Sequence, residues 1–566
     1  MAARGATGLP RPGSDAGRRA AGGAALLLAA LLLLMVVRLP WAGDLGMHAA
    51  VLERLRTDLP HPGNPLVDAH TPSPYYSPWT VLLAVVAEAT GWHTFPVLRL
   101  AAFVGLVLLV TGVGAFVVTF TRRAAAVPLA LLCVLLLYGV RLFAWSGFPG
   151  LTSLSLSLAY PSTFALGLAL HFLALLRRAL GGRTEAVRGL PAFLALGALL
   201  ACVLLSHQFT GAVAVLGAAA MLLGARPWPD RAVWARVGVA CVLTLVVLAL
   251  WPYYPFYSLP GAGGLDDIHR PLYDHLAAKF CLVGLGVVAL MARWGRDRRD
   301  PLAIFFVLGL AVFAAGGLSG HHSWGRILPA VLLPAQLALA IEVADAGADA
   351  FARRSRAVVP AVAVTTLALL AGAWTQAGVL TYVLRDAALP PVLRDVHRIA
   401  PWPSFAWAAR HVPKGATVMT DNYFALRMLP AYGPYTVAPA YPDFFLPDER
   451  RRREATRRYF DPATARAERL GILKEYGARW VVQRIGGPGL PEDDPSLRKA
   501  AQGPGGLALF EVAEVGRGVV SARGAGAPTA GGAGASVPGG AGAFMPGGAG
   551  TSTAGGAGTF MPGGAG

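Results

Sequence analysis

The sequence has 566 residues, of which 55% are hydrophobic and only 14% charged, and its mean hydropathy is +0.53. Soluble globular proteins carry about 25% charged residues. The composition therefore excludes an ordinary soluble protein and predicts a chain embedded in a bilayer. The net charge of +18 comes mostly from arginines in short loops between apolar runs. No basic motif interleaved with aromatic residues accompanies it, so we expect no nucleic-acid partner.

The first apolar run, from about Gly22 to Val37, follows a basic N-terminal segment (1–21) that we expect to be cytoplasmic. No small-x-small cleavage site follows it, so we interpret it as a retained first helix and not as a signal peptide. A membrane span needs about 20 apolar residues. By that measure the sequence predicts eleven spans, at roughly 22–40, 96–121, 125–145, 158–176, 189–206, 209–225, 232–252, 277–294, 301–318, 327–344 and 357–380.

Two further features of the apolar segments add to the prediction of eleven spans. The stretch 79–92 is apolar but short, and we interpret it as an interfacial or re-entrant helix. The four cysteines lie inside apolar runs, so we expect small buried side chains and neither disulfides nor metal ligands: Cys133, Cys202, Cys241 and Cys281.

The distribution of arginines among the loops predicts the orientation of the chain in the membrane. With eleven spans, the arginine-rich connections fall on one side, which the positive-inside rule makes cytoplasmic. The long first loop (41–95), the aromatic loop (253–276), the short loop (319–326) and everything after about 380 then lie outside the cytoplasmic membrane.

The C-terminal third differs from the rest. Residues 381–520 alternate β-rich runs with amphipathic runs and predict a small α/β domain. Within it "RWVVQRI" is typical of a buried strand, and "ATARAERLGILKEYG" predicts a helix closed by Gly477. The segment 521–566 is nearly all small residues with recurring "GGAG", so we expect a disordered low-complexity tail.

Polar residues gather on the predicted outer side. Asp44 follows the first span, and His48 lies four residues later, on the same face if a helix begins there. A carboxylate at the boundary between lipid and water can accept a proton from an incoming hydroxyl. His207, at an outer turn between two helices, is a candidate supporting residue, although a histidine at a helix end is often only structural.

The other outer loops add aromatic, acidic and cationic side chains. Arg326, at the mouth of a helix, is costly at the hydrocarbon edge unless paired, and a lipid phosphate suits its guanidinium. Arg326 could instead be an interfacial anchor, and the aromatic residues at 251–257 could likewise form an interfacial belt. The candidate phosphate ligands are Arg326, Lys279 and Arg270, and the candidate substrate contacts are Tyr253, Tyr254, Asp266, Asp267, His321 and His322.

Together these features resemble the membrane-embedded GT-C glycosyltransferases. The similarity covers roughly residues 22–515 and is carried by an acid soon after the first span, the long first loop, "YSPWTVLLAVVAEATGWHTFPVLRLAAFVGLVLL", "GRILPAVLLPAQLAL" and "GILKEYGARWVVQRI". The resemblance implies a polytopic α-helical membrane protein with a GT-C-like module at 22–380 and a small extracytoplasmic α/β domain. In this family the first-loop acid acts as base or orients the acceptor, which corresponds to Asp44. A late-helix arginine binds the lipid phosphate, which corresponds to Arg326.

The resemblance also implies a reaction, namely inverting transfer of a sugar from a polyprenyl-phosphate donor to a glycan, lipid or protein acceptor in the cell envelope. The sequence has Gly43-Asp44 with His48 and lacks the paired Asp-Glu of some members, which leaves the base and a divalent metal open. Two alternatives stay open: a transporter or flippase of envelope intermediates, and an inactive scaffold. The Ala-, Gly- and Arg-rich composition indicates a GC-rich genome, compatible with an actinobacterial envelope.

Overall fold

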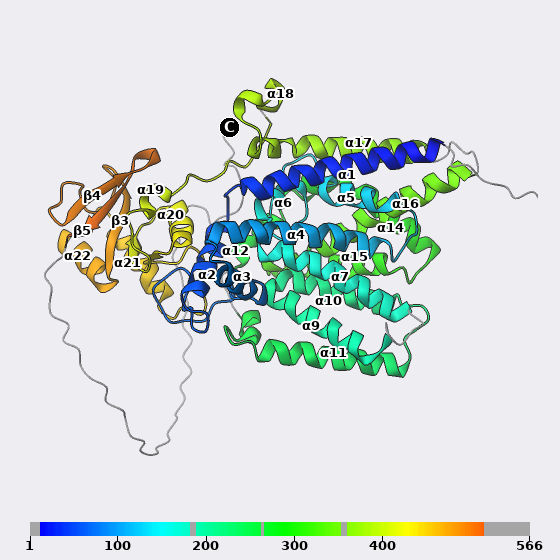
Figure 1. Cartoon of the computed structure of the whole chain (residues 1–566), viewed down its shortest axis with the longest axis horizontal. Coiled ribbons are helices and arrows are strands. Elements are labelled where there is room, and N and C mark those ends of the chain that lie inside the picture. The colour runs from blue at the N-terminus through cyan, green and yellow to red at the C-terminus, as the bar shows by residue number, and fades with distance from the viewer. Residues whose placement is uncertain (1–11, 182–187, 262–264, 353–358, 395, 514–566) are drawn as a thin grey trace, which may run out of the picture.

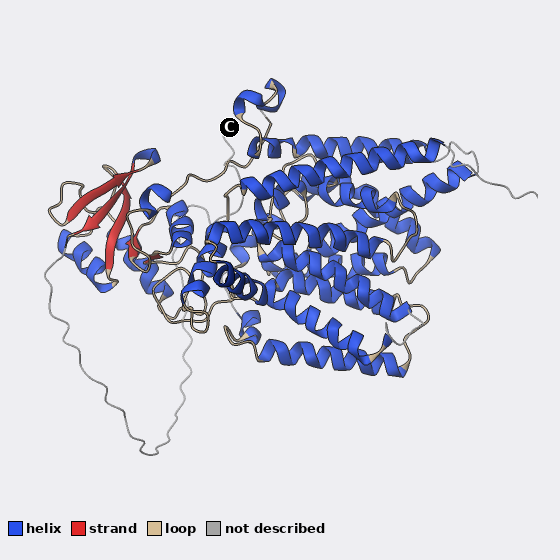
Figure 2. Ribbon diagram, viewed as in Figure 1, coloured by secondary structure: helices blue, strands red, loops and turns tan. Residues whose placement is uncertain are grey.

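The chain forms a helical bundle with a small α/β domain at one end of it (Figure 1). A computed structural model describes residues 12–181, 188–261, 265–352, 359–394 and 396–513. Figure 2 shows that the bundle is helical and that the sheet lies in the domain at its end. The tail predicted at 521–566, together with residues 514–520, lies outside the described residues, as does the start of the basic N-terminal segment.

Seven described helical segments are long and apolar enough to cross a membrane. The straight ones are α1 (Pro12–Arg38), α4 (Thr94–Val117), α7 (Pro161–Gly181), α11 (Arg231–Ala249) and α15 (Pro301–Ser319). The other two contain 3-10 turns: α13 (Leu276–Phe280) leads through η3 (Cys281–Val283) into α14 (Gly284–Arg296), and η4 (His322–Ile327) leads into α16 (Pro329–Ala352).

Four shorter apolar helices complete the set: α5 (Ala126–Leu136), α9 (Leu190–Ser206), α10 (Gln208–Leu223) and α17 (Val359–Thr375). Helices therefore occupy all eleven predicted segments, and the chain is a multi-pass membrane protein. The number of helices that cross the membrane stays a prediction.

The outer surface of the bundle is apolar, as a surface that faces lipid must be. Leu26 on α1, Leu245 on α11 and Leu367 on α17 are 72%, 53% and 65% exposed. By contrast, 83% of the apolar window of His322–Gly347 is buried inside the protein, against 17% for the window of Arg19–Arg38. Helix α16 therefore forms the centre of the bundle, and α1 lies at its edge.

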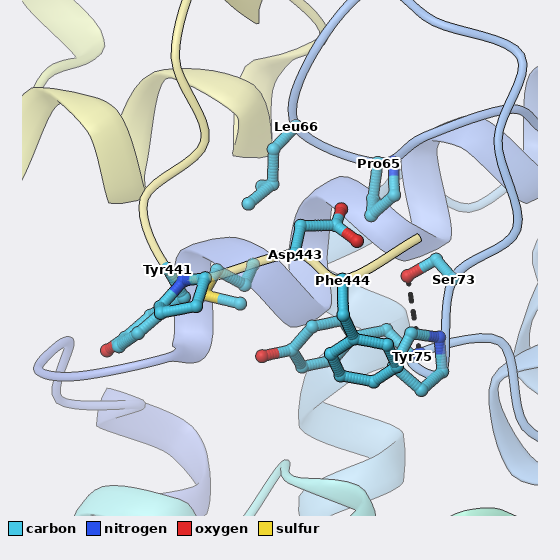
Figure 3. Close-up of a pocket in the computed structure, with 10 residues that line it drawn as sticks. Pro65, Leu66, Ser73, Tyr75, Tyr441, Asp443 and Phe444 are labelled. Carbon is cyan, nitrogen blue, oxygen red and sulfur yellow. Dashed lines mark hydrogen bonds between the residues drawn. The ribbon is translucent and has the colours of Figure 1, made fainter. Parts of the chain in front are cut away.

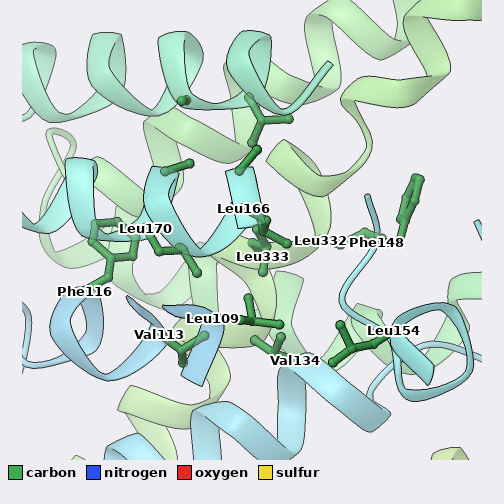
Figure 4. Packing of buried hydrophobic residues seen from close by; sticks show 14 of the residues in the cluster. Leu109, Val113, Phe116, Val134, Phe148, Leu154, Leu166, Leu170, Leu332 and Leu333 are labelled. Carbon is green, nitrogen blue, oxygen red and sulfur yellow. The ribbon is translucent and has the colours of Figure 1, made fainter. Parts of the chain in front are cut away.

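The central packing joins α4, α5, α7 and α16. Figure 4 shows side chains from these helices meeting in one cluster: Leu109, Val113, Phe116, Val134, Leu166, Leu170, Leu332 and Leu333. Small residues bring the helix axes close, as is common in membranes. A Cβ on Gly167 of α7 would lie 2.7 Å from the backbone of Leu108 on α4, and one on Gly286 of α14 would lie 2.3 Å from the Ala335 carbonyl on α16.

The predicted span at 125–145 is wrong in extent, because α5 ends at Leu136. The chain beyond it pairs with the start of α13–α14: the Val140 amide donates to the Ala278 carbonyl at 2.9 Å, and the Leu282 amide donates to the Tyr138 carbonyl at 2.9 Å. Gln336 of α16 donates to the Leu137 carbonyl at 2.8 Å. Irregular backbone within a bundle is tolerated when protein groups satisfy it in this way. The broken segment continues into α6 (Leu151–Ser157) and carries Trp145 and Ser146 toward the site described below.

Two short helices lie at the end of the bundle that faces the α/β domain: α2 (Leu45–Thr57) and α3 (Pro78–Thr90) (Figure 1). The predicted short helix at 79–92 is thus confirmed as α3. It begins at Ser77, whose side chain accepts from the Thr80 amide, and ends at Gly91 with φ +67°. The described part of the aromatic loop folds as short turns, including η1 (Phe256–Gly261), α12 (Asp266–His269) and η2 (Arg270–Leu272).

The α/β domain has a five-stranded mixed sheet in the order β2-β1-β3-β5-β4. The strands are β1 (Thr417–Met419), β2 (Tyr435–Thr436), β3 (Ala478–Arg484), β4 (Leu497–Gln502) and β5 (Leu507–Val512), and α20 (Tyr423–Met428), α21 (Glu449–Tyr459) and α22 (Arg466–Glu475) are its longest helices. β1 runs parallel to β2 and β3, whereas β5 runs antiparallel to β3 and β4. The predicted strand is β3, and the predicted helix is α22, followed by Gly477 with φ +58°.

The domain docks on α2 and on the first loop. The Trp402 amide donates to the Trp41 carbonyl at 2.8 Å, and the Thr436 amide donates to the Leu66 carbonyl at 2.9 Å. A Cβ on Gly46 would lie 2.0 Å from the Arg427 carbonyl of α20, so only glycine lets the two helices approach this closely.

The cysteines are free thiols in the described structure. The expectation that all four are buried is only partly correct: Cys133 is buried and Cys202 is half-buried, but Cys241 and Cys281 are exposed on the outer surface of the bundle. That surface faces lipid in a membrane, where a thiol behaves as a small hydrophobic group.

Candidate active site

Asp44 lies where the first helix has ended and α2 begins. It is the residue that precedes α2, and its carbonyl accepts from the His48 amide at 3.1 Å. Its carboxylate does not cap α2. Instead, Asp44 Oδ1 accepts a hydrogen bond from the Tyr441 hydroxyl at 2.5 Å, across 397 positions of sequence. Gly43, with φ +65°, makes the turn that places the carboxylate there.

His48 is one turn further along α2 and is buried, as the predicted i, i+4 spacing requires. Its ring packs against Tyr160 at 4.6 Å and lies edge-on to Tyr75 at 6.0 Å between ring centroids. Burial lowers the pKa of His48 to about 4, although the charge of Asp44 opposes the shift. The imidazole is therefore neutral at physiological pH, and its Nδ1 atom has no hydrogen-bond partner among the described residues.

Tyr441 is fixed by the α/β domain. The Arg427 guanidinium lies 4.3 Å from the Tyr441 ring centroid and 3.7 Å from that of Tyr423, and it donates to the Ala440 carbonyl at 3.0 Å. Burial raises the pKa of Tyr441, and the Asp44 charge raises it further. The phenol is thus always a donor to Asp44 at physiological pH.

Arg326 is buried at the start of the most enclosed helical segment, and its hydrogen-bond partners are neutral. Its Nη2 donates to Ser146 Oγ at 3.2 Å and lies 3.1 Å from His207 Nε2. The guanidinium carbon lies 4.7 Å from the Phe209 ring centroid. In the described part of the chain no carboxylate forms an ion pair with Arg326. A buried cation without a carboxylate partner is costly unless an anion balances its charge, which makes Arg326 a candidate anion ligand.

His207 supports Arg326 and does not contact Asp44 directly. It lies between α9 and α10, and its Nδ1 is 2.7 Å from Thr210 Oγ1. The same Nδ1 accepts from the Thr210 amide at 3.2 Å and so caps α10, while Nε2 lies beside the Arg326 guanidinium. Gly147, with φ +84°, passes beside this pair, and a Cβ there would lie 3.2 Å from the His207 ring.

Tyr75 joins the two halves of the site. Burial raises its pKa, the charges of Asp44 and Asp443 raise it further, and those of Arg427 and Arg326 lower it. All four charged groups are thus close enough to act on one phenol. Figure 3 shows Tyr75, Tyr441 and Phe444 around a small cavity whose lining also includes Asp443, Leu66 and Ser73.

The structure does not bring the other predicted phosphate ligands to Arg326. Lys279 is buried, but its ammonium donates to the Pro271 carbonyl at 2.6 Å and lies near Arg141 and Asp274. Arg270 is exposed on η2. The neighbouring residue His269, absent from the predicted site, is the one that faces Arg326: its ring lies 5.6 Å from Phe209 and 5.7 Å from Trp145. Burial and the Arg326 charge lower the pKa of His269 to about 4.

The predicted substrate contacts serve mainly as packing. Tyr253 donates to the Leu59 carbonyl at 2.9 Å, and buried Tyr254 donates to the Leu205 carbonyl at 3.4 Å. Asp266 accepts from the Ser323 amide at 2.8 Å, which ties α12 to the turn before Arg326.

The remaining predicted contacts lie at the edge of this arrangement. His321 stacks on Trp324 with ring centroids 5.5 Å apart, His322 lies 5.4 Å from the Tyr273 ring centroid, and Asp267 is exposed. None of the three is joined to Asp44 or Arg326 by a hydrogen bond or ring contact within the described ranges.

Sequence reasoning missed Tyr75, Ser146, His269, Arg427 and Tyr441. Tyr75 stands in the "SPYYSP" stretch and His269 within the aromatic loop, so position in the outer loops could have flagged both. Tyr441 and Arg427 come from the α/β domain, and no spacing in the sequence connects them to Asp44. Among the described residues, no group of three or more His, Cys, Asp or Glu side chains is placed to hold a metal ion.

Comparison with known proteins finds similarity in fold to solved structures. Neither a family model nor a curated protein matches the chain. Among solved structures, the mycobacterial arabinofuranosyltransferase AftD matches with TM-score 0.53 and 17% identity over 87% of this chain. ArnT from Cupriavidus metallidurans bound to undecaprenyl phosphate matches with TM-score 0.50 and 16% identity, over 86% of this chain and 98% of that one.

Both solved structures are GT-C superfamily members, and the resemblance found in the sequence is confirmed at the level of the fold. The chain spans 40% of the length of AftD.

Proposed function

We propose that this GT-C-fold protein transfers a sugar from a polyprenyl-phosphate donor to an envelope acceptor at the outer end of the bundle. Arg326 would bind the donor phosphate, and Asp44 would take the proton of the acceptor hydroxyl. A single observation carries the proposal. A buried guanidinium with only neutral partners and a carboxylate held by a phenol lie on the same site, close enough for both charges to act on Tyr75.

The proposed reaction is a single displacement. The acceptor oxygen attacks the anomeric carbon while the bond from that carbon to the phosphate oxygen breaks, so the anomeric configuration inverts. The acceptor proton passes to the Asp44 carboxylate, and polyprenyl phosphate leaves with the electron pair. Arg326 stabilises the negative charge of the leaving phosphate, a role that suits the planar fork of a guanidinium.

The neighbouring residues have supporting roles in this proposal. His207 and Ser146 orient the Arg326 guanidinium, and Tyr441 orients the Asp44 carboxylate while Oδ2 stays available to the acceptor. His48, neutral and with Nδ1 unpartnered in the described structure, can donate to or accept from a substrate hydroxyl. The solved ArnT bound to undecaprenyl phosphate supports a lipid-linked donor for this fold. The sugar and the acceptor stay outside the proposal.

The test is lipid analysis of a strain that lacks the protein. We expect a polyprenyl-phosphate sugar to accumulate and wild-type protein to consume it. Asp44→Asn keeps the shape and removes the base, so transfer should fall by about 10²–10⁴-fold while the protein still binds the donor. Asp493→Asn, an exposed carboxylate on the α/β domain, is the matched control and should transfer normally.

The same strains separate the two alternatives. Normal envelope glycans with Asp44→Asn would contradict the enzyme and favour a scaffold. Movement of the lipid-linked sugar across vesicles by Asp44→Asn protein, without any transfer, would favour a flippase.

The proposed orientation has the N-terminus in the cytoplasm and the α/β domain outside. It rests on the arginine-rich connections and on the position of the domain at the site end of the bundle (Figure 1). Reporter fusions after Arg178 and after Gly415 should report opposite sides. A shared side would contradict the odd number of spans and move the site to the other face.

A further inference from the structure

A second, larger cavity lies between the first outer loop and the α/β domain. Its volume is about 290 Å³, and it is separate from the small cavity beside Tyr441. The first loop contributes Asp58, His61, Asp68 and His70, and the domain contributes Lys414 and Tyr435. Neither the proposed reaction nor the donor phosphate uses these residues.

The inner wall of the cavity is rigid. The buried Arg54 guanidinium donates to the Gly433 and Pro434 carbonyls, each at 2.6 Å, and lies 3.6 Å from the Tyr435 ring centroid. Next to it, Glu53 accepts from Lys414 at 2.8 Å. Burial raises the pKa of Glu53, but hydrogen bonds from Lys414 and Thr94 outweigh that effect and hold the pKa below its usual value. The wall therefore carries fixed charges that already have partners.

The rim, by contrast, presents unused polar groups. The side chains of Asp68, His61 and His70 and the Tyr435 hydroxyl make no hydrogen bond within the part of the chain that the structure describes. Asp58 accepts from the His61 amide at 3.0 Å with Oδ1 only, which leaves Oδ2 open to the cavity. Carboxylate, imidazole and phenol groups thus offer both donors and acceptors around one space.

The polar groups at the rim limit the class of ligand that the cavity can bind. Two unpaired carboxylates disfavour a phosphate, and the polar rim disfavours an acyl chain. The rim does not hold a metal either, since no group of three metal-ligating side chains occurs in the described structure. The volume is near the lower end for small-ligand pockets, about 300 Å³. The rim side chains of Asp58, His61, Asp68 and His70 are exposed. An uncharged, polyhydroxylated ligand of one or two sugar rings can hydrogen-bond to such a rim and needs no charged partner.

We propose that this cavity binds neutral sugar units of an extended acceptor glycan whose end lies at Asp44. The inference rests on the proposed function. Glu53 at the cavity lies nine residues along α2 from Asp44, about 13 Å at 1.5 Å per residue, which is longer than one sugar ring. The first loop lines both spaces, with Ser73 and Tyr75 at the small cavity and Gly63 and His70 at the large one. The acceptor is then an oligosaccharide chain, not a free monosaccharide.

The test is binding of neutral glycans to the purified full-length protein by calorimetry. Mannohexaose and arabinohexaose are the probes, and methyl mannoside and methyl arabinoside are the single-ring comparisons. We expect at least one hexasaccharide to bind ten-fold or more tightly than its monosaccharide. Asp68→Ala and His70→Ala should each weaken that binding several-fold. His93→Ala, an exposed histidine away from the cavity, should leave it unchanged.

Asp44→Asn separates this inference from the proposed reaction, because it should lower transfer by about 10²–10⁴-fold and leave hexasaccharide binding at the cavity intact. Hexasaccharide binding that survives both Asp68→Ala and His70→Ala would overturn the inference, and so would the absence of binding by either probe. Neither of those results would touch the donor site, which is tested by transfer and by binding of a polyprenyl phosphate.

Discussion

The two charged halves of the candidate site are built in different ways. Arg326 is held within the bundle by Ser146, His207 and Phe209. Asp44 is held across the boundary between bundle and domain by Tyr441, which Arg427 positions. The cation therefore depends on helix packing alone, whereas the carboxylate depends on domain docking. Perturbations of the domain should change the acceptor half and leave the donor half intact.

The largest effect should come from the donor half. Arg326→Ala removes the buried cation at this point of the site, so it should weaken binding of a short-chain polyprenyl phosphate by about 2–5 kcal/mol. Arg326→Lys keeps the charge but loses the planar fork and should recover only part of this loss. Calorimetric titration of the detergent-purified protein measures both. Arg270→Ala is the matched control, because Arg270 is exposed, and equal losses in both variants would contradict a site at Arg326.

The next effect concerns stability and pH. The pKa of His48 is about 4 in the folded protein and 6.5 unfolded, so below pH 6.5 the unfolded chain binds the proton more tightly. Stability should therefore fall between pH 6.5 and 4, by about 3 kcal/mol from this group. His48→Gln should flatten the pH dependence of the melting temperature over that range. An unchanged slope in His48→Gln would assign the acid sensitivity to other groups, His269 first.

A smaller effect should follow loss of the phenol that holds Asp44. Tyr441→Phe removes one hydrogen bond to a charged group, worth about 1.5–3 kcal/mol. Without that bond the carboxylate loses its fixed orientation toward the acceptor, so transfer should fall. Donor binding should stay at the wild-type value. A Tyr441→Phe protein that transfers sugar at the wild-type rate would reduce Tyr441 to a packing residue.

The smallest effect should come from the rim of the docking surface. The Lys414 side chain is 67% exposed although it pairs with Glu53, and exposed ion pairs contribute about 0–1 kcal/mol. Lys414→Ala should lower the melting temperature only slightly. Arg54→Ala should lower it much more, because it removes two buried hydrogen bonds and leaves the Pro434 carbonyl without its side-chain donor, while the Gly433 carbonyl keeps the Gly415 amide. Similar losses in the two variants would mean that the domain docks through other contacts.

Apolar run length and loop chemistry predicted much of the fold. The eleven helical segments, the short helix α3, the strand β3 and the helix α22 follow from run length, periodicity and turn residues, which are local properties of the chain. The end of α5 at Leu136 was not predictable in this way. It depends on Gln336 and on backbone pairing with residues near 278, both remote in sequence.

The candidate site likewise contains some residues that local sequence features predicted and others that they did not. Asp44, His48 and Arg326 were identified because their residue types are costly or unusual at a membrane boundary, which is visible in the sequence. Arg270 and Lys279 met the same criterion, yet one is exposed and the other is bound to the Pro271 carbonyl. Charge and position at a helix end cannot tell a cation that faces a site from one that faces solvent or closes a turn.

The sequence by itself determined that the chain enters a membrane and how its apolar helices are distributed, and it predicted which side gathers the polar loops. Hydrophobic burial and the positive-inside rule act on composition and need no knowledge of packing. Only the tertiary structure decided that His207 contacts Arg326, that His269 replaces Arg270 beside it, and that Tyr441 reaches Asp44 from another domain. Those contacts depend on how elements far apart in the chain approach one another, and no local pattern carries that information.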